Sequence, residues 1–347
     1  MKSGHDLGLH RVLEPEGALP QAALRLDATA EAYRNEVVIA VETLNVDSAS
    51  FHQILEEVGA SEEAVARRIE TIVDARGKMQ NPVTGSGGML LGEVLSVGPD
   101  YHGAVKLKPG DKIATLVSLT LTPLRIEKIH KVHLDADQVD ITGRAYLWPS
   151  SPIVVMPADL DPRVALAALD VCGAPAQTKR LVEGARSVMI LGAGKSGMLC
   201  AATARHYLGE NAKIFGIDLV DKNLKILKEG GLIDDYRTAN ARAPVEVLQA
   251  VEEMNNGALV DLVINTCNVS GTEMAAILPV RQRGKVYFFN MATDFARAAL
   301  GSEGVGKDVD LLIGNGYAEG HAQLTLEMVR AYPVVQTQLE ELLMGSE

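Results

Sequence analysis

The chain has 347 residues, of which 33 are basic and 45 acidic, so its formal net charge is −12. That charge disfavours nucleic acid or an anionic membrane as the main partner and favours a small-molecule ligand. Hydrophobic residues make up 47% of the chain and aromatic residues 4%, which is typical of an aliphatic α/β interior and excludes a disordered chain. The length is sufficient for two domains.

Targeting signals and cysteine pairs are not evident in the sequence. No segment has the features of a signal peptide, and no run of about 18 uncharged apolar residues occurs. We therefore expect a cytoplasmic protein without a membrane partner. The three cysteines are Cys172, Cys200 and Cys267. Their odd number and the absence of a CxxC spacing predict reduced thiols rather than a disulfide framework.

The first part of the chain is predicted to form strands with one helical excursion. Apolar and polar residues alternate over 36–44, which indicates a strand. Residues 61–76 indicate an amphipathic helix with Ser61 as its N-cap. The glycine-punctuated segment 85–116, with a Pro-Gly-Asp turn at 109–111, indicates a small β-barrel.

From about Pro157 onward, short apolar strands alternate with helices, which is typical of a doubly wound parallel sheet. The helices are long enough to cross from one strand to the next. The expected strands are 187–191, 212–218, 260–267, 285–290 and 309–315; the expected crossover helices are 197–208, 221–231 and 244–256; and closing helices are expected at 321–332 and 336–343.

A glycine-rich turn, GAGKSG, lies between the expected strand 187–191 and the helix that follows it. Gly192 permits the tight turn, Gly194 lets the backbone approach a pyrophosphate, and Gly197 allows close packing of helix against strand. The free N–H groups at the start of the helix would then face the phosphates. The turn predicts a dinucleotide site, with Lys195 and Ser196 as further candidate contacts.

Four polar residues at strand ends complete the predicted dinucleotide site. Asp218 ends the second expected strand about 20 positions after the glycine turn, where an acid accepts the adenosine ribose hydroxyls. This acid favours NAD over NADP, because a carboxylate repels a 2′-phosphate. Asn268, Asn290 and Asn315 follow three further strands, so they could contact the ribose or nicotinamide, or simply form turns.

Two groups of segments resemble medium-chain dehydrogenases. The strings GSGGMLLGEVLSVG and KPGDKIA resemble their GroES-like domain, and MPADLDPRVALAALDVCGAP resembles the helical approach to their cofactor domain. The resemblance implies a GroES-like β-barrel domain over 1–156 and a Rossmann domain, a doubly wound parallel sheet, over 157–319. It also implies that the C-terminal helices in 320–347 pack back on the first domain and that the protein is a homodimer or homotetramer.

More narrowly, the segments LNVDSASF, GKMQNPVTGSGGML and LGAGKSGMLC resemble the family of L-erythro-3,5-diaminohexanoate dehydrogenases. The resemblance implies that NAD takes a hydride from C3 of this diamino acid in lysine fermentation. The resulting imine would be hydrolysed to 5-amino-3-oxohexanoate and ammonia. These reaction details come from the resemblance alone.

The chain departs from zinc-dependent medium-chain dehydrogenases at the positions of their metal ligands. Where those relatives carry a cysteine, this chain reads Val46-Asp47-Ser48, and where they carry a histidine it reads Gly85-Ser86-Gly87. Cys172 lies near the third ligand position, but one thiol cannot form a catalytic zinc site. The four-cysteine structural lobe is also absent. We therefore expect no metal in the mechanism.

Without a metal, removal of a hydride from C3 requires a neutral amine, so a carboxylate should receive the substrate ammonium. Asp47 is the first candidate, with Glu303 and Asp170 as others, although Asp47 could instead cap the following helix. The substrate carboxylate could bind Arg125 or Lys78. Either of these cations could instead be a surface charge.

Two other functions are compatible with the same motifs. The first is a zinc-independent quinone or enoyl reductase, against which Asp218 argues because such enzymes commonly use NADPH. The second is a non-catalytic dinucleotide-binding protein. It would bind NADH but show no amine-dependent turnover.

Overall fold

The computed structural model of the chain describes residues 2–29, 31–116, 118–290 and 292–344. Contacts within the chain divide it into two compact units, one formed by Met1–Asp170 with Glu340–Glu347 and one formed by Val171–Leu339. We describe each unit by itself. Among the described residues, no helix is long and apolar enough to cross a membrane.

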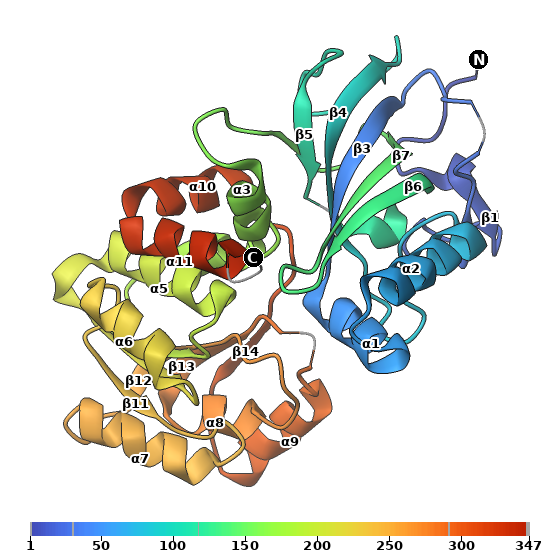
Figure 1. Cartoon of the computed structure of the whole chain (residues 1–347). Helices are drawn as coiled ribbons and strands as arrows, with labels where there is room; N and C mark the ends of the chain where they lie inside the picture. Colours follow the sequence, from blue (N-terminus) through green and yellow to red (C-terminus); the bar gives the residue numbers. More distant parts are fainter. Residues whose placement is uncertain (1, 30, 117, 291, 345–347) are drawn as a thin grey trace. The chain divides into compact units, whose positions relative to one another are not determined.

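The first unit is built on a six-stranded sheet with the strand order β6-β7-β3-β4-β5-β8 (Figure 1). All five pairs of neighbouring strands are antiparallel. The strands are β3 (Val37–Val46), β4 (Gly88–Val97), β5 (Lys112–Thr115), β6 (Leu124–His133), β7 (Gln138–Leu147) and β8 (Ile153–Val155), and a separate two-stranded sheet contains β1 (Val12–Glu14) and β2 (Arg25–Leu26).

Helices α1 (Ser48–Val58) and α2 (Glu62–Arg76) contribute to the core of the first unit. Ser61 is the N-cap of α2, as predicted, and its hydroxyl accepts the Ala64 N–H. The apolar stripe of α2 is fully buried with residues of α1 and of the sheet. The unit also contains α3 (Pro162–Leu169) and the short 3₁₀ helices Leu9–Arg11 and Leu119–Leu121.

The second unit contains a six-stranded parallel sheet with the order β11-β10-β9-β12-β13-β14. Counted from its first strand, this is the order 3-2-1-4-5-6 of the Rossmann fold. The predicted doubly wound sheet is therefore confirmed. Its strands are β9 (Ser187–Leu191), β10 (Lys213–Asp218), β11 (Asp235–Thr238), β12 (Val260–Asn265), β13 (Val280–Phe288) and β14 (Asp310–Ile313).

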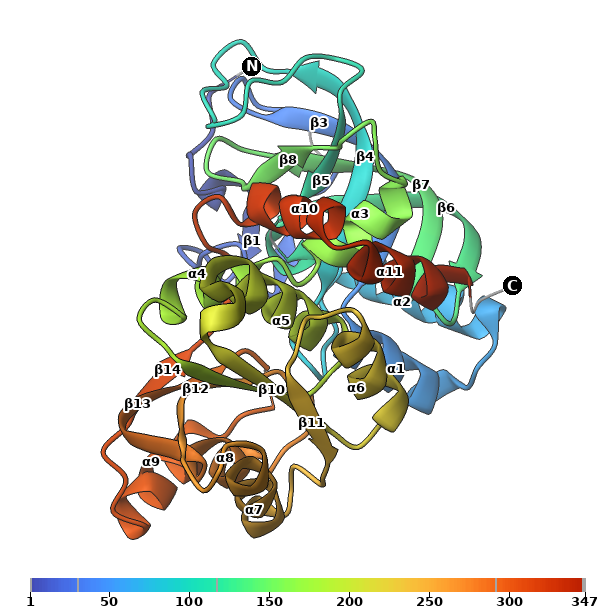
Figure 2. The ribbon, with the colours of Figure 1, turned by 90° about the vertical axis from the view of Figure 1, so that its left-hand side faces the viewer.

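Helices cover both faces of the parallel sheet (Figure 2). One face carries α4 (Gly173–Leu181), α5 (Lys195–Leu208) and α6 (Asp221–Glu229), with a short 3₁₀ helix at Gly209–Asn211. The other face carries α7 (Pro244–Met254), α8 (Glu273–Ile277) and α9 (Phe295–Gly304). Apolar residues of these last three helices form one buried cluster with the sheet, so the strands are buried on both faces.

The C-terminal helices differ from the sequence prediction. Helix α10 (His321–Ala331) packs on α4 and α5 of the second unit, where Leu324 and Met328 are buried. Helix α11 (Pro333–Met344) follows it, and the chain is counted with the first unit only from Glu340 onward. Helix α3 belongs to the first unit, although the sequence placed it in the second. The long apolar face of α10 explains why this helix stays with α4 and α5.

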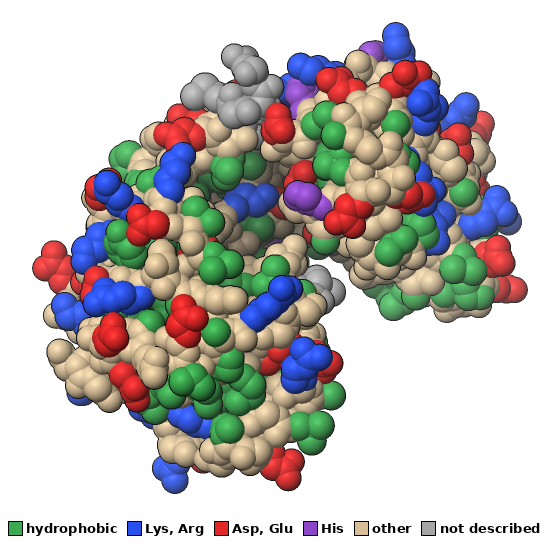
Figure 3. Space-filling view, turned by 60° about the horizontal axis from the view of Figure 1, so that its bottom comes forward, with side chains coloured by type: hydrophobic (Ala, Val, Ile, Leu, Met, Phe, Trp, Pro, Cys, Tyr) green, Lys and Arg blue, Asp and Glu red, His purple; other side chains and the backbone are tan. Residues whose placement is uncertain are grey.

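The surface carries charges of both signs. On the face drawn in Figure 3, acidic and basic side chains are interspersed with apolar ones. The excess of acidic residues therefore does not produce a surface of a single sign there.

Candidate dinucleotide and substrate sites

The glycine turn after β9 is shaped by close backbone contacts. Gly192 has a φ of 97°, a conformation that residues with a side chain rarely adopt. A Cβ on Gly197 would overlap the carbonyl oxygen of Gly192. The sequence therefore needs glycine at both positions for the strand to turn directly into helix α5.

The start of α5 is suited to an anionic ligand. Gly194 is the N-cap of α5, and no side chain of the described residues caps the helix there. Gly194 is exposed, and apart from its own chain neighbours no atom of the described residues lies within 4 Å of the position that a Cβ would occupy. The first-turn N–H groups are thus accessible to an acceptor from outside the chain, and the geometry fits the pyrophosphate of a dinucleotide. Lys195 and Ser196 follow as half-buried residues.

Asp218 lies at the carboxyl end of β10, directly beside the glycine turn. Its Oδ2 accepts the Ala193 N–H at 2.6 Å and its Oδ1 accepts the Val220 N–H at 2.8 Å. The carboxylate is therefore oriented by main-chain atoms of both neighbouring loops. This is the position predicted for an acid that accepts ribose hydroxyls, although its contact with a ribose stays a prediction.

The three predicted asparagines all follow strands at the carboxyl edge of the parallel sheet. Asn268 is exposed after β12. Asn315 is exposed after β14, and its Oδ1 accepts the Tyr317 N–H. Asn290 follows β13, and its Oδ1 accepts the Ala292 N–H at 3.0 Å. Among the described residues its buried Nδ2 has no hydrogen-bond partner. Turn formation thus accounts for the side-chain oxygen of Asn290. Its side-chain NH₂ is left available as a hydrogen-bond donor.

Two residues at the end of β12 support the glycine turn and were missed by sequence reasoning. Thr266 Oγ1 donates to the carbonyl oxygen of Gly192 at 3.0 Å. Asn265 is fully buried, and its Nδ2 donates to Thr272 Oγ1 at 2.9 Å. A polar pair at the end of an otherwise apolar strand was the available signal. Hydrogen bonds therefore join the loop after β12 to the glycine turn and also connect the two ends of this loop.

In the first unit, Asp47 occupies the end of β3 and is the N-cap of α1. Its Oδ1 accepts the N–H groups of Ala49 and Ser50 at 3.1 and 3.4 Å. Burial and the nearby carboxylate of Asp170 raise the pKa of Asp47, while hydrogen bonds from Ser50, Ser86 and Ala49 oppose that increase. The structure thus confirms the helix cap, and the charge of Asp170, in the same unit, acts on the pKa of Asp47.

At the positions where zinc-dependent relatives are expected to carry metal ligands, this chain has Asp47 and Ser86, and the interaction with Ser86 lowers the pKa of Asp47. Over residues 2–29, 31–116, 118–290 and 292–344, no three His, Cys, Asp or Glu side chains gather to hold a metal. Cys172 is buried, and burial raises the pKa of Cys200 to about 12. Cys172, Cys200 and Cys267 form no disulfide. A metal-free mechanism stays a prediction.

The chain is similar to known proteins over nearly its whole length. A family profile described as L-erythro-3,5-diaminohexanoate dehydrogenase N-terminal domain matches residues 10–157. A relative of that name from Acetoanaerobium sticklandii is 51% identical over 98% of this chain and 99% of its own. Another from Fusobacterium nucleatum subsp. nucleatum is 50% identical over 99% of both chains. The chain belongs to the L-erythro-3,5-diaminohexanoate dehydrogenase family.

The fold of this family member is shared with more distant dehydrogenases. An alcohol dehydrogenase from Thermotoga maritima has a TM-score of 0.59 at 16% identity, with 89% of this chain and 85% of that chain covered. At that identity the likeness concerns the fold alone. It confirms the predicted combination of a GroES-like domain and a Rossmann domain, and family membership confirms that the chain is a dehydrogenase.

The structure of this dehydrogenase corrects the prediction for Lys78. The side chain is fully buried, and its Nζ donates to the main-chain oxygens of Pro20 and Gln21 at 2.9 and 3.2 Å. Burial lowers the pKa of Lys78 to about 8. The ammonium therefore holds the N-terminal segment in place and is not presented to a substrate carboxylate.

Arg125 is at the wrong end of the sheet to share a substrate with Asp47. It is exposed on the edge strand β6 and is opposite Arg144 of β7, which is opposite Ala40 of β3. Asp47 follows the last residue of β3, so the two positions are separated by roughly 20 Å along the strand at about 3.3 Å per residue. A six-carbon diamino acid cannot span that distance.

Glu303 also lies away from the predicted site. Helix α9 begins after β13 at the carboxyl edge of the parallel sheet and returns toward the start of β14. Glu303 is exposed near the end of α9 and therefore lies toward the amino edge. Ligands bind such sheets at the carboxyl edge, so Glu303 cannot meet the substrate there.

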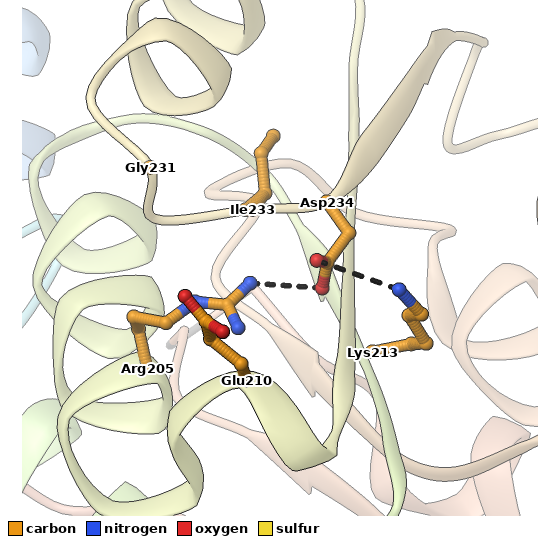
Figure 4. Close-up of a pocket in the computed structure, with 6 residues that line it drawn as sticks. All are labelled: Arg205, Glu210, Lys213, Gly231, Ile233 and Asp234. Atoms are coloured by element: carbon orange, nitrogen blue, oxygen red, sulfur yellow. Dashed lines mark hydrogen bonds and ion pairs between the residues drawn. The ribbon is translucent and has the colours of Figure 1, made fainter.

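A polar pocket in the second unit is distinct from the dinucleotide site (Figure 4). Asp234 is within 2.8 Å of Arg205 Nη2 and within 3.8 Å of Lys213 Nζ. Lys213 is the first residue of β10, whereas Asp218 is the last. The pocket is therefore at the amino edge of the sheet, and its Asp234 already pairs with Arg205 and Lys213.

Proposed function

We propose that this dehydrogenase catalyses the NAD-dependent oxidative deamination of L-erythro-3,5-diaminohexanoate at C3. The products would be 5-amino-3-oxohexanoate, NADH and ammonium, formed in the cytoplasm by a homo-oligomer as a step of lysine fermentation. The observation that supports this proposal most strongly is the identity of about half of all residues, over nearly the whole chain, with two relatives named for this substrate.

The choice of NAD rests on the second unit. NAD, when bound, would accept a hydride from C3 of the substrate. The uncapped start of α5 and the open surface at Gly194 suit its pyrophosphate. The carboxylate of Asp218 would accept ribose hydroxyls and repel the 2′-phosphate of NADP.

The proton acceptor we propose is Asp47. The C3 ammonium must lose one proton before C3 can release a hydride, since only a nitrogen lone pair can form the C=N bond. One oxygen of Asp47 is engaged by the N–H groups of Ala49 and Ser50, so its second oxygen is the one to receive that proton. Burial, and after it the charge of Asp170, raise the pKa of Asp47, which makes Asp47 a stronger base.

The proposed reaction has two stages, oxidation of the amine and hydrolysis of the resulting iminium ion. In the first, the ammonium transfers a proton to Asp47, C3 loses a hydride, and the substrate becomes an iminium ion. In the second, water adds to the C=N carbon, and the nitrogen leaves as ammonium to yield the ketone. Asp47 returns its proton to solvent at the end of the cycle. The hydroxyl of Ser86, which lowers the pKa of Asp47, would help to orient the carboxylate.

The direct test mixes purified protein with NAD and L-erythro-3,5-diaminohexanoate and measures NADH absorbance together with released ammonium. We expect one ammonium for each NADH formed, and we expect activity to persist after treatment with a zinc chelator. A folded protein that binds NADH but yields neither product would refute the proposed reaction. Loss of activity on chelation, restored by zinc, would refute the metal-free mechanism.

A further inference from the structure

The loop between β14 and α10, residues 314–320, leaves the parallel sheet at its carboxyl edge. In a sheet of this strand order, the dinucleotide lies across that edge. Asp218 on β10 marks the adenosine side, so the nicotinamide side lies toward β12, β13 and β14. Asn315 and Tyr317 are exposed in this loop. The loop is thus a surface available to the nicotinamide end of the cofactor.

One buried side chain holds this loop in place. Gln177 of α4 is 4% exposed. Its Nε2 donates to the main-chain oxygen of Asn315 at 3.0 Å and to that of Tyr317 at 3.2 Å. Both N–H groups of one amide are therefore used on the main chain of a loop about 140 residues away in sequence.

The backbone of the loop also lies directly on the first turn of α4. A Cβ on Gly173 would overlap the Asn315 carbonyl oxygen and approach the Gly316 carbonyl carbon to 2.7 Å. At its other end, the loop is fixed by the ring of Tyr317, which packs on the ring of His321 with centroids 4.9 Å apart. The loop conformation therefore depends on residues outside the loop, and Gln177 supplies the polar part of that support.

Side chains of similar size and shape cannot make the hydrogen bonds that Gln177 makes. Leucine and methionine have no donor for the two carbonyl oxygens, and a buried acceptor without a partner is unfavourable. Glutamate would place a carboxylate against both carbonyl oxygens. Gln177 is 4% exposed and directs both of its side-chain N–H groups at the loop, so we expect it to act through the loop.

We propose that Gln177 is a positioning residue for the nicotinamide end of the cofactor, because it fixes the conformation of residues 314–320. This inference rests on the proposed NAD dependence. It predicts that loss of Gln177 weakens recognition of the nicotinamide group and leaves the adenosine and pyrophosphate contacts intact. A purely structural role would weaken binding of every part of the dinucleotide together.

The test compares Gln177→Leu and Gln177→Glu with Asn255→Leu. Asn255 is a matched control in the same unit, since its Nδ2 donates to the main-chain oxygens of Ala258 and Leu259 at 3.0 and 3.4 Å. That loop precedes β12 and lies at the amino edge of the sheet. Binding of NADH and of ADP-ribose, which lacks the nicotinamide base, is measured by calorimetry, together with kcat and KM for NAD.

We expect both Gln177 variants to bind NADH about tenfold more weakly while ADP-ribose affinity stays within about twofold, since misplacing a contact loop costs at least that much. Asn255→Leu should change neither affinity. Unchanged NADH binding by the Gln177 variants, or an equal loss for both ligands, would overturn this inference alone. Failure of the unmodified protein to bind NADH would overturn the proposed function, and this inference with it.

Discussion

The loops after β9 and after β3 both follow buried strands, yet they present different kinds of chemical group. After β9, main-chain atoms form the binding surface, and glycines at 192, 194 and 197 keep it open. After β3, the groups are the side chains of Asp47, Ser86 and Asp170, which come from three distant segments. The first site therefore depends on a local backbone path, whereas the second depends on the folding of a whole unit.

The two sites also differ in how many roles one residue has. A Cβ added at Gly194 would approach no described atom outside its own chain neighbours within 4 Å. The role of Gly194 toward a ligand is therefore separable from its role in folding. Asp47 caps α1 and is also the proposed proton acceptor. Substitutions in the glycine turn can therefore isolate binding directly, while those at Asp47 need a control for helix capping.

The largest expected effect is at Gly197. Gly197→Ala would place a methyl group against the Gly192 carbonyl oxygen, so the turn must shift. A shift of about 1 Å at a binding loop can cost on the order of 100-fold. We expect NADH affinity to fall by about that factor and the melting temperature to fall as well, measured by calorimetry and thermal unfolding.

Gly194→Ala is the matched variant in the same turn. Its φ of −74° is accessible to alanine, and nothing lies within 4 Å of the new methyl group. We expect an unchanged melting temperature and NADH binding weaker by about tenfold or more, since the methyl group would obstruct the pyrophosphate. Normal NADH affinity in Gly194→Ala would show that the dinucleotide does not approach this turn.

At the other site, Asp47→Asn should reduce kcat/KM by about 100-fold to 10,000-fold, the usual contribution of a general base. Asparagine remains a good N-cap, so the melting temperature should change little. Asp161→Asn is the control, because Asp161 caps α3 in the same way by accepting the Arg163 and Val164 N–H groups. Comparable losses in both variants would attribute the effect to capping and remove Asp47 from the mechanism.

The contrast between the sites explains what sequence alone could predict. The glycine turn, Asp218 and five of the six strands of the parallel sheet were predicted, because short strings specify them. Lys78 and Arg125 were chosen for their charge, and charge does not reveal whether a side chain is buried under main-chain carbonyls or exposed at the far end of a strand. Glu303 was misplaced because the residues of α9 do not indicate in which direction the helix runs relative to the sheet.

The missed elements of the fold have similar physical causes. In β6 the ladder with β7 shifts between Ile126 and Lys128 and again between Ile129 and Lys131. These irregularities disrupt the alternation that would have indicated a strand. Strand β11 has only four residues, Asp-Tyr-Arg-Thr, and forms by pairing with β10 rather than by its own pattern.

A smaller effect is expected for Asp218→Asn. Each carboxylate oxygen of Asp218 accepts one main-chain N–H, whereas asparagine has a single oxygen and can accept only one of the two. Asparagine also lacks the charge that would repel a 2′-phosphate. We expect the ratio of kcat/KM for NAD to that for NADP to fall by about tenfold, and we expect the melting temperature to fall because one main-chain N–H loses its acceptor. An unaltered ratio would assign the NAD preference to other residues and limit Asp218 to ordering the Ala193 and Val220 N–H groups.

The smallest expected effect is a change in pH dependence caused by Asp170→Asn. The negative charge of Asp170 raises the pKa of Asp47, after the larger contribution of burial, so its removal lowers that pKa. If Asp47 must be ionised to accept a proton, activity declines as the pH falls through its pKa. The acidic limb of the kcat/KM profile should therefore move to lower pH in Asp170→Asn and stay in place in Asp161→Asn, at the other end of α3. A shift in the opposite direction, or an equal shift in both variants, would show that Asp170 does not raise the pKa of Asp47. Asp170 would then have no place in the proposed substrate site.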